Sequence, residues 1–591
     1  MNRWERRWYG VSAMRKTAQN MNQHMEQNMK PDMKNWKRRI VGAEKGMVVM
    51  LVLILIITLS LLAAAANRNV VTDISIASNH LGSQQAFYAA DAGVQYGFNQ
   101  LWQQLQLLNP NVAAITFPTL SGYTFGGNFI QAIGARVQRP ATGTFAGLSA
   151  YVQRWRIAST ATEAKTGSKG MVTLDVEDQL IPIFQFGVFY NDNLEMEPGA
   201  NMTFTGGRIH SNSNIYMAET GSSVSLTVNA PITSAQNLYA YRLDGAATNH
   251  NVYISNGQGS DPLLSIDSTA ANWATQSQVI WNGNVKTSVN GITALNVPMP
   301  VAGQPISLVG TGQGSLDQMA GVVITDLTAK DRNGNPITIP CYYSSSHAAA
   351  NDTGCGAGNG HLANPITVTT VYDYRQGGAQ TVVNVELAKV LPAVQTALDN
   401  PPTSCDPGIL YISSSDSSRS VRLWNGGTIP AEGLTIASNL PVCVQGDYNS
   451  ANNPAAIAAD AVTVLSNSWP QPQNSTQYGA STSISSRPAS TTTVNAAFMV
   501  GNKDTSGSQY SGGLENLVRF LENWSNVTFN YSGSLVCLWQ SAHANSNWPG
   551  TGTVYNPPNR NWSYGINVNK LPPGTPRVRY VMKLGWRVVT N

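Results

Sequence analysis

Lys45-Gly46-Met47-Val48-Val49-Met50-Leu51 opens an apolar run that continues without a charged side chain to Ala66. At about 1.5 Å per residue, a helix over residues 47–66 spans the roughly 30 Å of a bilayer's hydrocarbon core. An uncharged helix of this length is more typical of a membrane span than of a soluble domain's core. We therefore predict a transmembrane helix that begins at Met47.

The residues before this run are strongly basic. Residues 1–46 hold 11 Lys or Arg side chains against 4 Asp or Glu side chains, a net charge of +7. Because basic flanks stay in the cytoplasm, the long C-terminal part of the chain is predicted to be exported. Cleavage by a secretory signal peptidase at Ala63–Ala66 is an alternative that the sequence leaves open.

The helix is predicted to continue beyond the apolar run. No proline interrupts residues 47–108, and Pro110 disfavours helix in the residue before it. Apolar side chains recur at steps of three or four and mark one stripe along the helix: Phe87, Ala90, Val94, Phe98, Leu101, Leu105 and Leu108. Half of the helix would lie in a bilayer or filament core, and half would pack under an external domain.

Two segments, Lys45–Val49 (KGMVV) and Gln85–Val94 (QAFYAADAGV), carry a resemblance to a known family. They are similar to the N-terminal region of PilX-type minor pilins of type IV pilus systems, over about residues 42–110. The resemblance implies cleavage by prepilin peptidase between Gly46 and Met47, N-methylation of Met47, and insertion into a pilus or pseudopilus.

Two departures qualify this resemblance. Major pilins carry a glutamate at the fifth mature position, where this chain has Leu51, so the resemblance favours a minor, priming or tip subunit. The basic leader is also longer than is usual for the family. The implied partners are other pilins or pseudopilins, the assembly machinery, the prepilin peptidase and the inner membrane.

Composition favours an exported protein rich in β-structure. Charged residues make up only 12% of the chain, and glycine is abundant at 52 residues. Without the leader the chain holds 25 Lys or Arg and 28 Asp or Glu side chains, so the basic pI comes from the leader. We expect no nucleic-acid partner and no cofactor.

Residues 151–162 and 170–178 alternate apolar and polar side chains around a turn at 167–170. This pattern predicts a β-hairpin that packs on the exposed half of the helix.

A repeat of about 21 residues follows. Segments that begin at Val188, Ile209 and Ile232 align, and in each an asparagine precedes an aliphatic residue: Asn193-Leu194, Asn214-Ile215 and Asn237-Leu238. This period is typical of a parallel β-helix whose asparagines stack as a ladder, with an ordinary β-sandwich as the alternative. Residues 433–446 and 456–467 are again about 21 apart and predict a second such stretch.

Helices are predicted at Glu386–Asn400, although it contains Pro392, and at Leu514–Trp524. The segment Asp331–Pro336 begins like a calcium loop, but it lacks the glycine and the glutamate that such a loop needs, so a hairpin turn is favoured.

All five cysteines lie beyond residue 340, on the exported side. Cys341, His347, Cys355 and His361 do not have common metal-ligand spacing, so a Cys341–Cys355 disulfide is favoured over a metal site.

The chain lacks the common catalytic motifs, and we expect no enzyme. Glu195 and Glu197 alternate with apolar residues and face one side of a strand; such a pair could serve a glycosidase, but a solvated strand face is favoured. Surfaces bearing Trp and Tyr could contact a carbohydrate or an abiotic surface.

The predicted fold class is α+β, with a pilin-type transmembrane helix followed by an all-β region that includes parallel β-helix coils. The predicted segments are a leader (1–46), the helix (47–110), a hairpin region (111–185), the repeat region (186–320), a region with a hairpin and a cysteine loop (321–432) and a C-terminal β region (433–591).

The predicted function is that of a minor pilin-like subunit, in the inner membrane and then at the cell surface, acting in pilus assembly, priming or tip adhesion. The alternative is a membrane-anchored surface-binding module that enters no filament.

Overall fold

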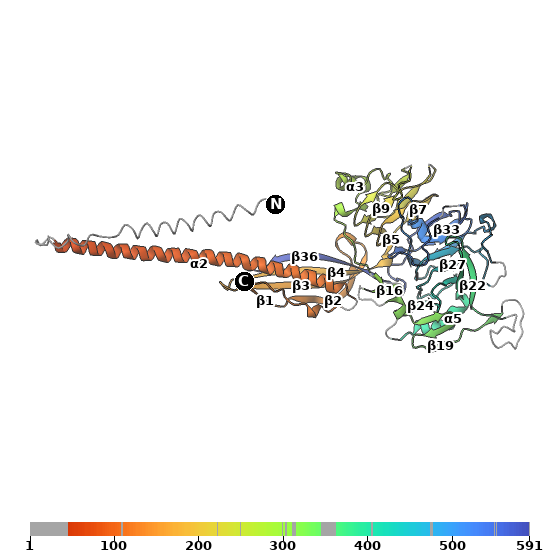
Figure 1. The fold of residues 1–591 in the computed structure, drawn as a ribbon, viewed down its shortest axis with the longest axis horizontal. Helices are drawn as coiled ribbons and strands as arrows, with labels where there is room; N and C mark the ends of the chain where they lie inside the picture. The colour runs from red at the N-terminus through yellow and green to blue at the C-terminus, as the bar shows by residue number, and fades with distance from the viewer. Residues whose placement is uncertain are drawn as a thin grey trace. The chain divides into compact units, whose positions relative to one another are not determined.

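The computed structural model describes residues 45–589 (Figure 1), with gaps at 108–109, 222, 249, 298, 302–303, 310–314, 344–361, 403–405, 473–476, 549 and 551. The chain divides into two compact units, Met1–Gln84 and Gln85–Asn591.

The described part of the first unit is helical and apolar. Helix α2 runs from Lys45 to Leu105, and it contains a stretch that is long and apolar enough to cross a membrane. The hydroxyl groups of Thr58, Thr72 and Ser75 donate to carbonyls of the same helix, as Thr72 Oγ1 does to Arg68 O at 2.8 Å. These polar groups therefore need no partner outside the helix. The predicted long N-terminal helix is confirmed.

The second unit contains an antiparallel sheet, here called sheet A. Its strands are β1 (Tyr123–Gly126), β2 (Ile130–Pro140), β3 (Ser149–Glu163), β4 (Lys169–Pro182) and β36 (Arg577–Val588). Strands β3 and β4 form the predicted hairpin, with Tyr151 opposite Leu180 and Ala161 opposite Gly170. The C-terminal half of α2 packs on this sheet through Ala90, Val94 and Leu101.

Strand β36 lies beside β4, although almost 400 residues separate them in the chain. The residues between Pro182 and Arg577 are therefore an insertion between two neighbouring strands of sheet A. We call residues 186–563, which hold the strands β5 to β35, the inserted region.

The first part of the inserted region consists of stacked turns of chain, each with three short strands. The strands are β5 (Phe186–Tyr190), β6 (Leu194–Met196), β7 (Met202–Thr205), β8 (Arg208–Ser211), β9 (Ile215–Met217), β10 (Leu226–Asn229), β11 (Ile232–Ser234), β12 (Leu238–Tyr239), β13 (Val252–Ile254) and β14 (Val285–Lys286). Equivalent strands pair in parallel, with Ile232 opposite Ile209 and Leu238 opposite Ile215. These are the residues that the sequence repeat aligned.

The asparagine ladder also forms. The Oδ1 atom of Asn193 accepts from the backbone N–H of Asn214 at 3.2 Å, and Oδ1 of Asn214 accepts from that of Asn237 at 3.1 Å. The aliphatic residues that follow, Ile215 and Leu238, are fully buried in the main core. The asparagine side chains thus provide hydrogen-bond acceptors for backbone N–H groups in the turns, while the aliphatic side chains fill the interior.

The later strands stack in the same way. They are β17 (Val322–Thr325), β24 (Ile409–Ser413), β25 (Ser420–Trp424), β26 (Leu434–Ala437), β27 (Val442–Gln445), β28 (Ala455–Ala459), β29 (Val462–Leu465), β30 (Thr492–Asn495), β31 (Ala497–Val500), β32 (Val518–Phe520), β33 (Thr528–Ser532), β34 (Leu535–Cys537) and β35 (Asn559–Ser563). In the first of the long parallel ladders the spatial order is β14-β11-β8-β5-β34-β31-β28-β26-β24-β17.

This order means that the chain enters the stack in its middle, at β5. It proceeds to one end at β14, resumes at the other end at β17, and returns until β34 pairs with β5 and β35 pairs with β7. We call the β34–β5 and β35–β7 contacts the seam.

A six-stranded sheet, here called sheet G, covers another side of the later turns. Its order is β22-β23-β25-β27-β29-β32, in which β22 (Ile366–Asp373) and β23 (Gly378–Glu386) form an antiparallel hairpin. Other short elements are α3 (Trp273–Trp281), α4 (Leu316–Met319), β15 (Met299–Val301), β16 (Gln304–Val309), β18 (Thr328–Asp331), β19 (Pro336–Ile337), β20 (Tyr342–Tyr343) and β21 (Leu362–Ala363).

Two local predictions are confirmed and one is wrong. Helix α5 spans Leu387–Asp399 with Pro392 inside it, and Asp331–Pro336 is the turn between β18 and β19. The predicted helix at Leu514–Trp524 stops at Leu517, where α6 (Leu514–Leu517) gives way to strand β32. The pairing of β32 with β29 overrides the local helical preference.

Candidate functional site

Gly46 and Met47, the predicted processing residues, lie in the first turn of α2 and are exposed. No described atom lies within 4 Å of the position that a Cβ atom on Gly46 would take. A glycine inside a helix costs up to about 1 kcal/mol relative to alanine. The described packing therefore gives no structural reason for glycine at this position.

The large apolar residues that follow are exposed from Met47 to Leu81, before the part of the helix that packs on sheet A. Met47 is 72% exposed, Val52 49% and Leu62 66%, and Leu51 is also exposed. A continuous apolar surface of this length is not stable in water and needs lipid or other protein around it.

The segment QAFYAADAGV has a packing role in the second unit. A Cβ atom on Gly93 would lie 2.3 Å from Ser159 Oγ, and one on Gly97 would lie 2.8 Å from Ile157 Cγ2. Gly93 in this segment and Gly97 just after it thus let the helix approach strand β3 closely. Asp91 accepts a hydrogen bond from Trp586 Nε1 of β36 at 2.8 Å, which links the helix to the last strand.

A hollow of about 190 Å³ lies on the outer face of sheet G, and sequence reasoning did not identify it. Alternate residues of the strands, such as Val421, Val442 and Val462, fill the interior. The residues between them point outward and form one cross-strand row, with Arg422, Cys443, Thr463 and Arg519 on successive strands. Short side chains at 443 and 463 leave a depression between the two arginines.

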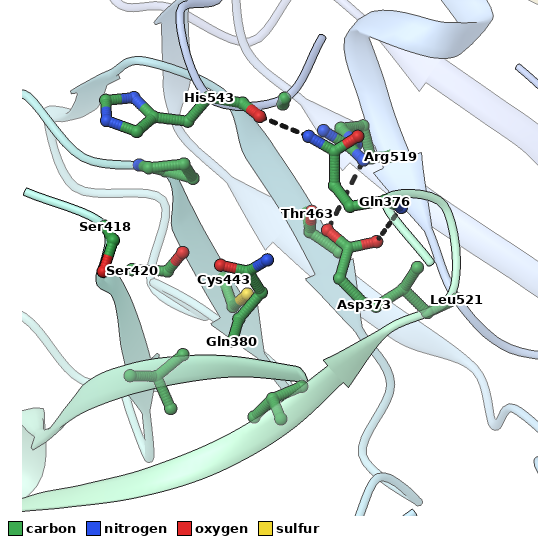
Figure 2. A pocket seen from close by; sticks show the side chains of 14 residues that line it. Asp373, Gln376, Gln380, Ser418, Ser420, Cys443, Thr463, Arg519, Leu521 and His543 are labelled. Atoms are coloured by element: carbon green, nitrogen blue, oxygen red, sulfur yellow. Dashed lines mark hydrogen bonds and ion pairs between the residues drawn. The ribbon is translucent and has the colours of Figure 1, made fainter. Parts of the chain in front are cut away.

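Two loops form the walls of this hollow (Figure 2). Gln376, after β22, donates from Nε2 to the carbonyl of His543 and accepts from the backbone N–H of Ser546 at 2.9 Å. Asp373 accepts from the backbone N–H of Gln376 at 3.0 Å, which fixes the turn that carries it. The hairpin β22–β23 and the loop around residue 543 are thereby held together over the sheet.

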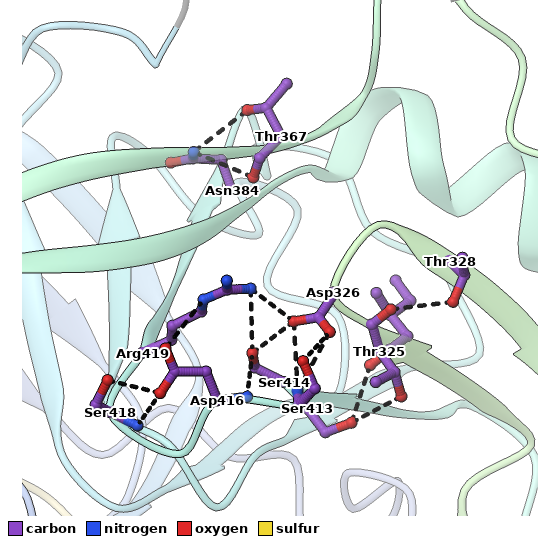
Figure 3. Close-up of polar contacts among 12 residues, drawn as sticks. Thr325, Asp326, Thr328, Thr367, Asn384, Ser413, Ser414, Asp416, Ser418 and Arg419 are labelled. Carbon is purple, nitrogen blue, oxygen red and sulfur yellow. Dashed lines mark hydrogen bonds and ion pairs between the residues drawn. The ribbon is translucent and has the colours of Figure 1, made fainter.

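A polar cluster positions the third wall (Figure 3). Asp326, in a left-handed conformation at φ 51°, accepts from Ser415 Oγ at 2.6 Å and from Arg419 at 2.8 Å. Hydrogen bonds from Ser414 and Ser415, with the Arg419 charge, lower the pKa of Asp326 to about 2. The loop 414–419 is therefore anchored to β17, and it presents Ser418 to the hollow.

Some of the polar groups that line the hollow have hydrogen-bond partners in the described part of the chain, and others have none. Arg519 is 5% exposed; its terminal nitrogen lies 3.5 Å from Asp373 Oδ2, and its Nε atom has no hydrogen-bond partner in the described part of the chain. The side chains of Gln380 and Thr463 also make no hydrogen bond to a described residue. The Gln380 and Thr463 side chains are therefore available to a ligand, whereas Arg519 Nε is itself closed to solvent.

Buried cations dominate the electrostatics around the hollow. Burial, with the nearby Arg519, lowers the pKa of Arg375 to about 9, and burial lowers the pKa of Arg422 to about 10. Asp373 is the only carboxylate among the described lining residues. Both arginines remain charged at neutral pH, so the hollow has a positive potential.

His543, which also lines the hollow, is paired with a buried acid behind it. Its Nδ1 atom lies 3.2 Å from Asp460 Oδ2, and this carboxylate raises the pKa of His543. Burial raises the pKa of the neighbouring Cys443 thiol to about 12. At neutral pH the thiol therefore stays protonated and is a poor nucleophile.

Glu195 and Glu197 lie on one side of β6, as predicted, but they are not a solvated face. They are 2% and 1% exposed, with Thr505 Oγ1 donating to Glu195 at 2.7 Å and Arg242 lying 3.4 Å from Glu197. Burial raises the pKa of Glu195 to about 7 and that of Glu197 to about 8. Neither carboxylate is open to a substrate.

The remaining predicted sites fall partly outside the described residues. Cys341 is disulfide-bonded, whereas Cys355, His347 and His361 lie outside the described residues, so the pairing with Cys355 stays a prediction. Cys443 and Cys537 are free thiols. Within the described part of the chain, no group of three or more His, Cys, Asp or Glu side chains could hold a metal ion.

Most of the described tryptophans support the core and are not a binding surface. The fully buried ones are Trp273, Trp281, Trp469, Trp524 and Trp562. A small aromatic face remains where Tyr239 stacks between Tyr216 and Tyr241, with ring centroids 4.9 Å apart on each side.

Residues 45–95 match the family model described as PilX N-terminal. No curated protein matches the chain. Among solved structures, the crystal structure of the competence-associated pilin ComZ from Thermus thermophilus is similar at 9% identity and a TM-score of 0.25, covering 86% of this chain and 98% of that chain. The N-terminal match includes Gly46, Met47 and the QAFYAADAGV segment. Residues 45–95 are therefore a PilX N-terminal segment of the kind found in minor pilins.

Proposed function

We propose that this chain is a minor subunit of a type IV pilus or pseudopilus, and that it acts in assembly or priming or as a tip adhesin. The role is structural: α2 enters the filament core, and the second unit is presented outside the cell. Its partners are other pilins or pseudopilins and the assembly machinery.

The exposed apolar surface of α2 carries this proposal. Residues 47–62 have about half or more of their large apolar side chains' surface uncovered, and they include no charged side chain. Before assembly, a bilayer would shield this apolar surface from water. In a filament, neighbouring apolar helices would shield it.

Gly46 supports processing at the start of this helix. Since the described packing does not require glycine there, selection by a peptidase with a narrow subsite accounts for it. Cleavage after Gly46 would give Met47 a free amine for N-methylation and would remove the leader of net charge +7.

The disulfide bond of Cys341 supports export of the second unit. Disulfides persist in oxidising compartments and are rare in the cytosol. The proposed localisation is therefore the inner membrane, with residues beyond α2 outside the cytoplasm and at the cell surface after assembly.

The mass of the mature chain tests processing. In cells that hold prepilin peptidase, the wild-type chain should begin at N-methylated Met47, and Gly46→Leu should retain residues 1–46. Gly42→Leu, four residues earlier in the same leader, is the matched control and should be processed normally.

A mature mass unchanged by Gly46→Leu would contradict the proposal. Wild-type protein that keeps its leader, or that begins after Ala66, would instead favour a tethered or released module.

A further inference from the structure

The hollow on sheet G is lined by polar groups of which some are not used by the fold. Arg519 is nine-tenths buried, lines the hollow and keeps Nε without a described partner, while Thr463 and Gln380 beside it are also unengaged. The Arg519 guanidinium lines the hollow and is only loosely paired with Asp373, at 3.5 Å, so a ligand with a negative charge is favoured there. We propose that the hollow binds one sugar ring that carries a carboxylate, a uronic acid residue.

The size of the hollow fits a single ring. Its volume of about 190 Å³ is below the roughly 300–1,000 Å³ of sites for drug-sized molecules. The walls formed by the hairpin β22–β23 and by loops 414–419 and 541–546 prevent a larger rigid ligand from lying flat on the sheet. A terminal or side-branch residue of a longer glycan can still enter.

The charge of the site fits a monoanion. Arg519 lies on the floor, Arg375 and Arg422 are buried nearby, and Asp373 faces Arg519 at 3.5 Å. Asp373 already offsets one of these cations and repels a second negative charge, which disfavours a phosphate dianion. A carboxylate can accept a charge-assisted hydrogen bond from the Arg519 guanidinium where that group lines the hollow.

The other lining groups fit the hydroxyls and the ring. Gln380 and Thr463 offer donors and acceptors to hydroxyl groups, and the Gln376 amide is held in place by His543 and Ser546. Val371, Val382 and Leu521 supply apolar contact for the C–H face of a pyranose. Ligand pockets of this kind combine apolar walls with a few fixed polar groups.

This inference does not depend on incorporation into a filament, because every group involved lies in the second unit. Failure of Gly46-dependent processing would leave it unaffected. Loss of sugar binding would leave the proposed pilus role unaffected.

Titration calorimetry on the full chain in detergent micelles tests the site, with D-glucuronate, D-glucose and inorganic phosphate as probes. We expect wild-type protein to bind glucuronate at one site and to bind glucose and phosphate at least about 10-fold more weakly. Arg519→Met should weaken glucuronate binding about 10- to 100-fold, because a charge-assisted hydrogen bond is lost. Arg332→Met is the matched control, since this exposed arginine lies in the β18–β19 turn outside the hollow.

Thr463→Val is a second test variant, for use if Arg519→Met does not fold. Valine has nearly the same shape as threonine, so the hollow should keep its shape. The substitution should weaken glucuronate binding about 3- to 10-fold and leave the unfolding midpoint unchanged, because the hydroxyl has no described partner. Equal affinity for glucose and glucuronate, preference for phosphate, absence of any binding, or unchanged binding in both variants would overturn the proposal.

Discussion

Glu195 illustrates how one buried residue makes stability depend on pH. Its carboxyl lies under the segment that carries Thr505, and burial raises its pKa to about 7. The folded state therefore holds a proton that an unfolded chain, with a glutamate pKa near 4.3, releases. This residue stabilises the fold fully below about pH 4.5, and its contribution is lost as pH rises through 7.

Glu195→Gln should remove that part of the pH dependence, because glutamine resembles the protonated carboxyl. At pH 8 the variant should be more stable than wild type by up to about 3 kcal/mol, and at pH 5 the two should be similar. Denaturant unfolding of the full chain in micelles at both pH values measures this.

Glu432→Gln is the control for this comparison, because the Glu432 side chain is 85% exposed and its removal should leave the pH dependence unchanged. If Glu195→Gln and the wild type were equally stable at pH 8, ionisation of Glu195 would not reduce the free energy of unfolding, and the prediction would be wrong.

At the scale of single residues, the sequence predicted which side of a strand a side chain lies on, but it did not predict which residues pack against that side chain. Alternation along β6 correctly placed Glu195 and Glu197 on one side. It could not show that residues more than 300 positions later cover them, because burial of that side is set by long-range packing. Arg519 and Thr463 were missed for the same reason: they become a floor only when β29 and β32 pair.

Among the elements, the contact of α2 with sheet A depends on small residues. Gly93 and Gly97 lie where any Cβ atom would meet β3 or its neighbours. Leu101 and Leu105 complete the buried face farther along the helix. The QAFYAADAGV segment is thus explained here by close packing between a helix and a strand.

Gly97→Leu should destabilise the second unit by about 1–3 kcal/mol or more, because the added side chain overpacks against Ile157 and Phe129. Asn99→Leu, at an exposed position two residues on, should change stability by less than about 0.5 kcal/mol. Thermal unfolding of the two variants compares them, and equal midpoints would mean that the helix can move away from the sheet.

The elements that the sequence predicted well are those with a local signal. The long helix, the β3–β4 hairpin, α5 and the asparagine ladder follow from periodicity and turn residues. The helix expected at Leu514–Trp524 failed because strand pairing across the stack outweighs local preference for residues 518–520.

On the scale of the whole molecule, the second unit is large, and cleavage after Gly46, as proposed, would make Leu51 the fifth mature residue, where the resemblance implies a glutamate in major pilins. An incoming subunit's N-terminal amine would find no carboxylate there, and a buried unpaired ammonium is costly. We therefore expect one or a few copies per filament, at the tip.

Immunogold labelling of sheared filaments tests this position. Label should appear at filament ends, and deletion of the gene should reduce pilus number or adhesion while the major pilin is still made. Label spread evenly along filaments would contradict a tip location.

The entry of the chain into the middle of its own stack could not be predicted from the sequence. Within the repeat, a period near 21 specifies which residues pair. The seam joins Val188 to Leu535, which no period relates, so only the folded chain reveals it.

The insertion between β4 and β36 also determines how the molecule would carry mechanical load. Pro182 and Arg577, where the chain leaves and re-enters sheet A, are register partners, so both connections emerge at one point. Tension between α2 and the inserted region would pull β4 and β36 lengthwise. Ladder hydrogen bonds run perpendicular to antiparallel strands, so this pull would shear many rungs of the β3–β4 ladder together and would not open them one at a time. The junction is thus arranged so that a retracting filament would load it in its most resistant direction.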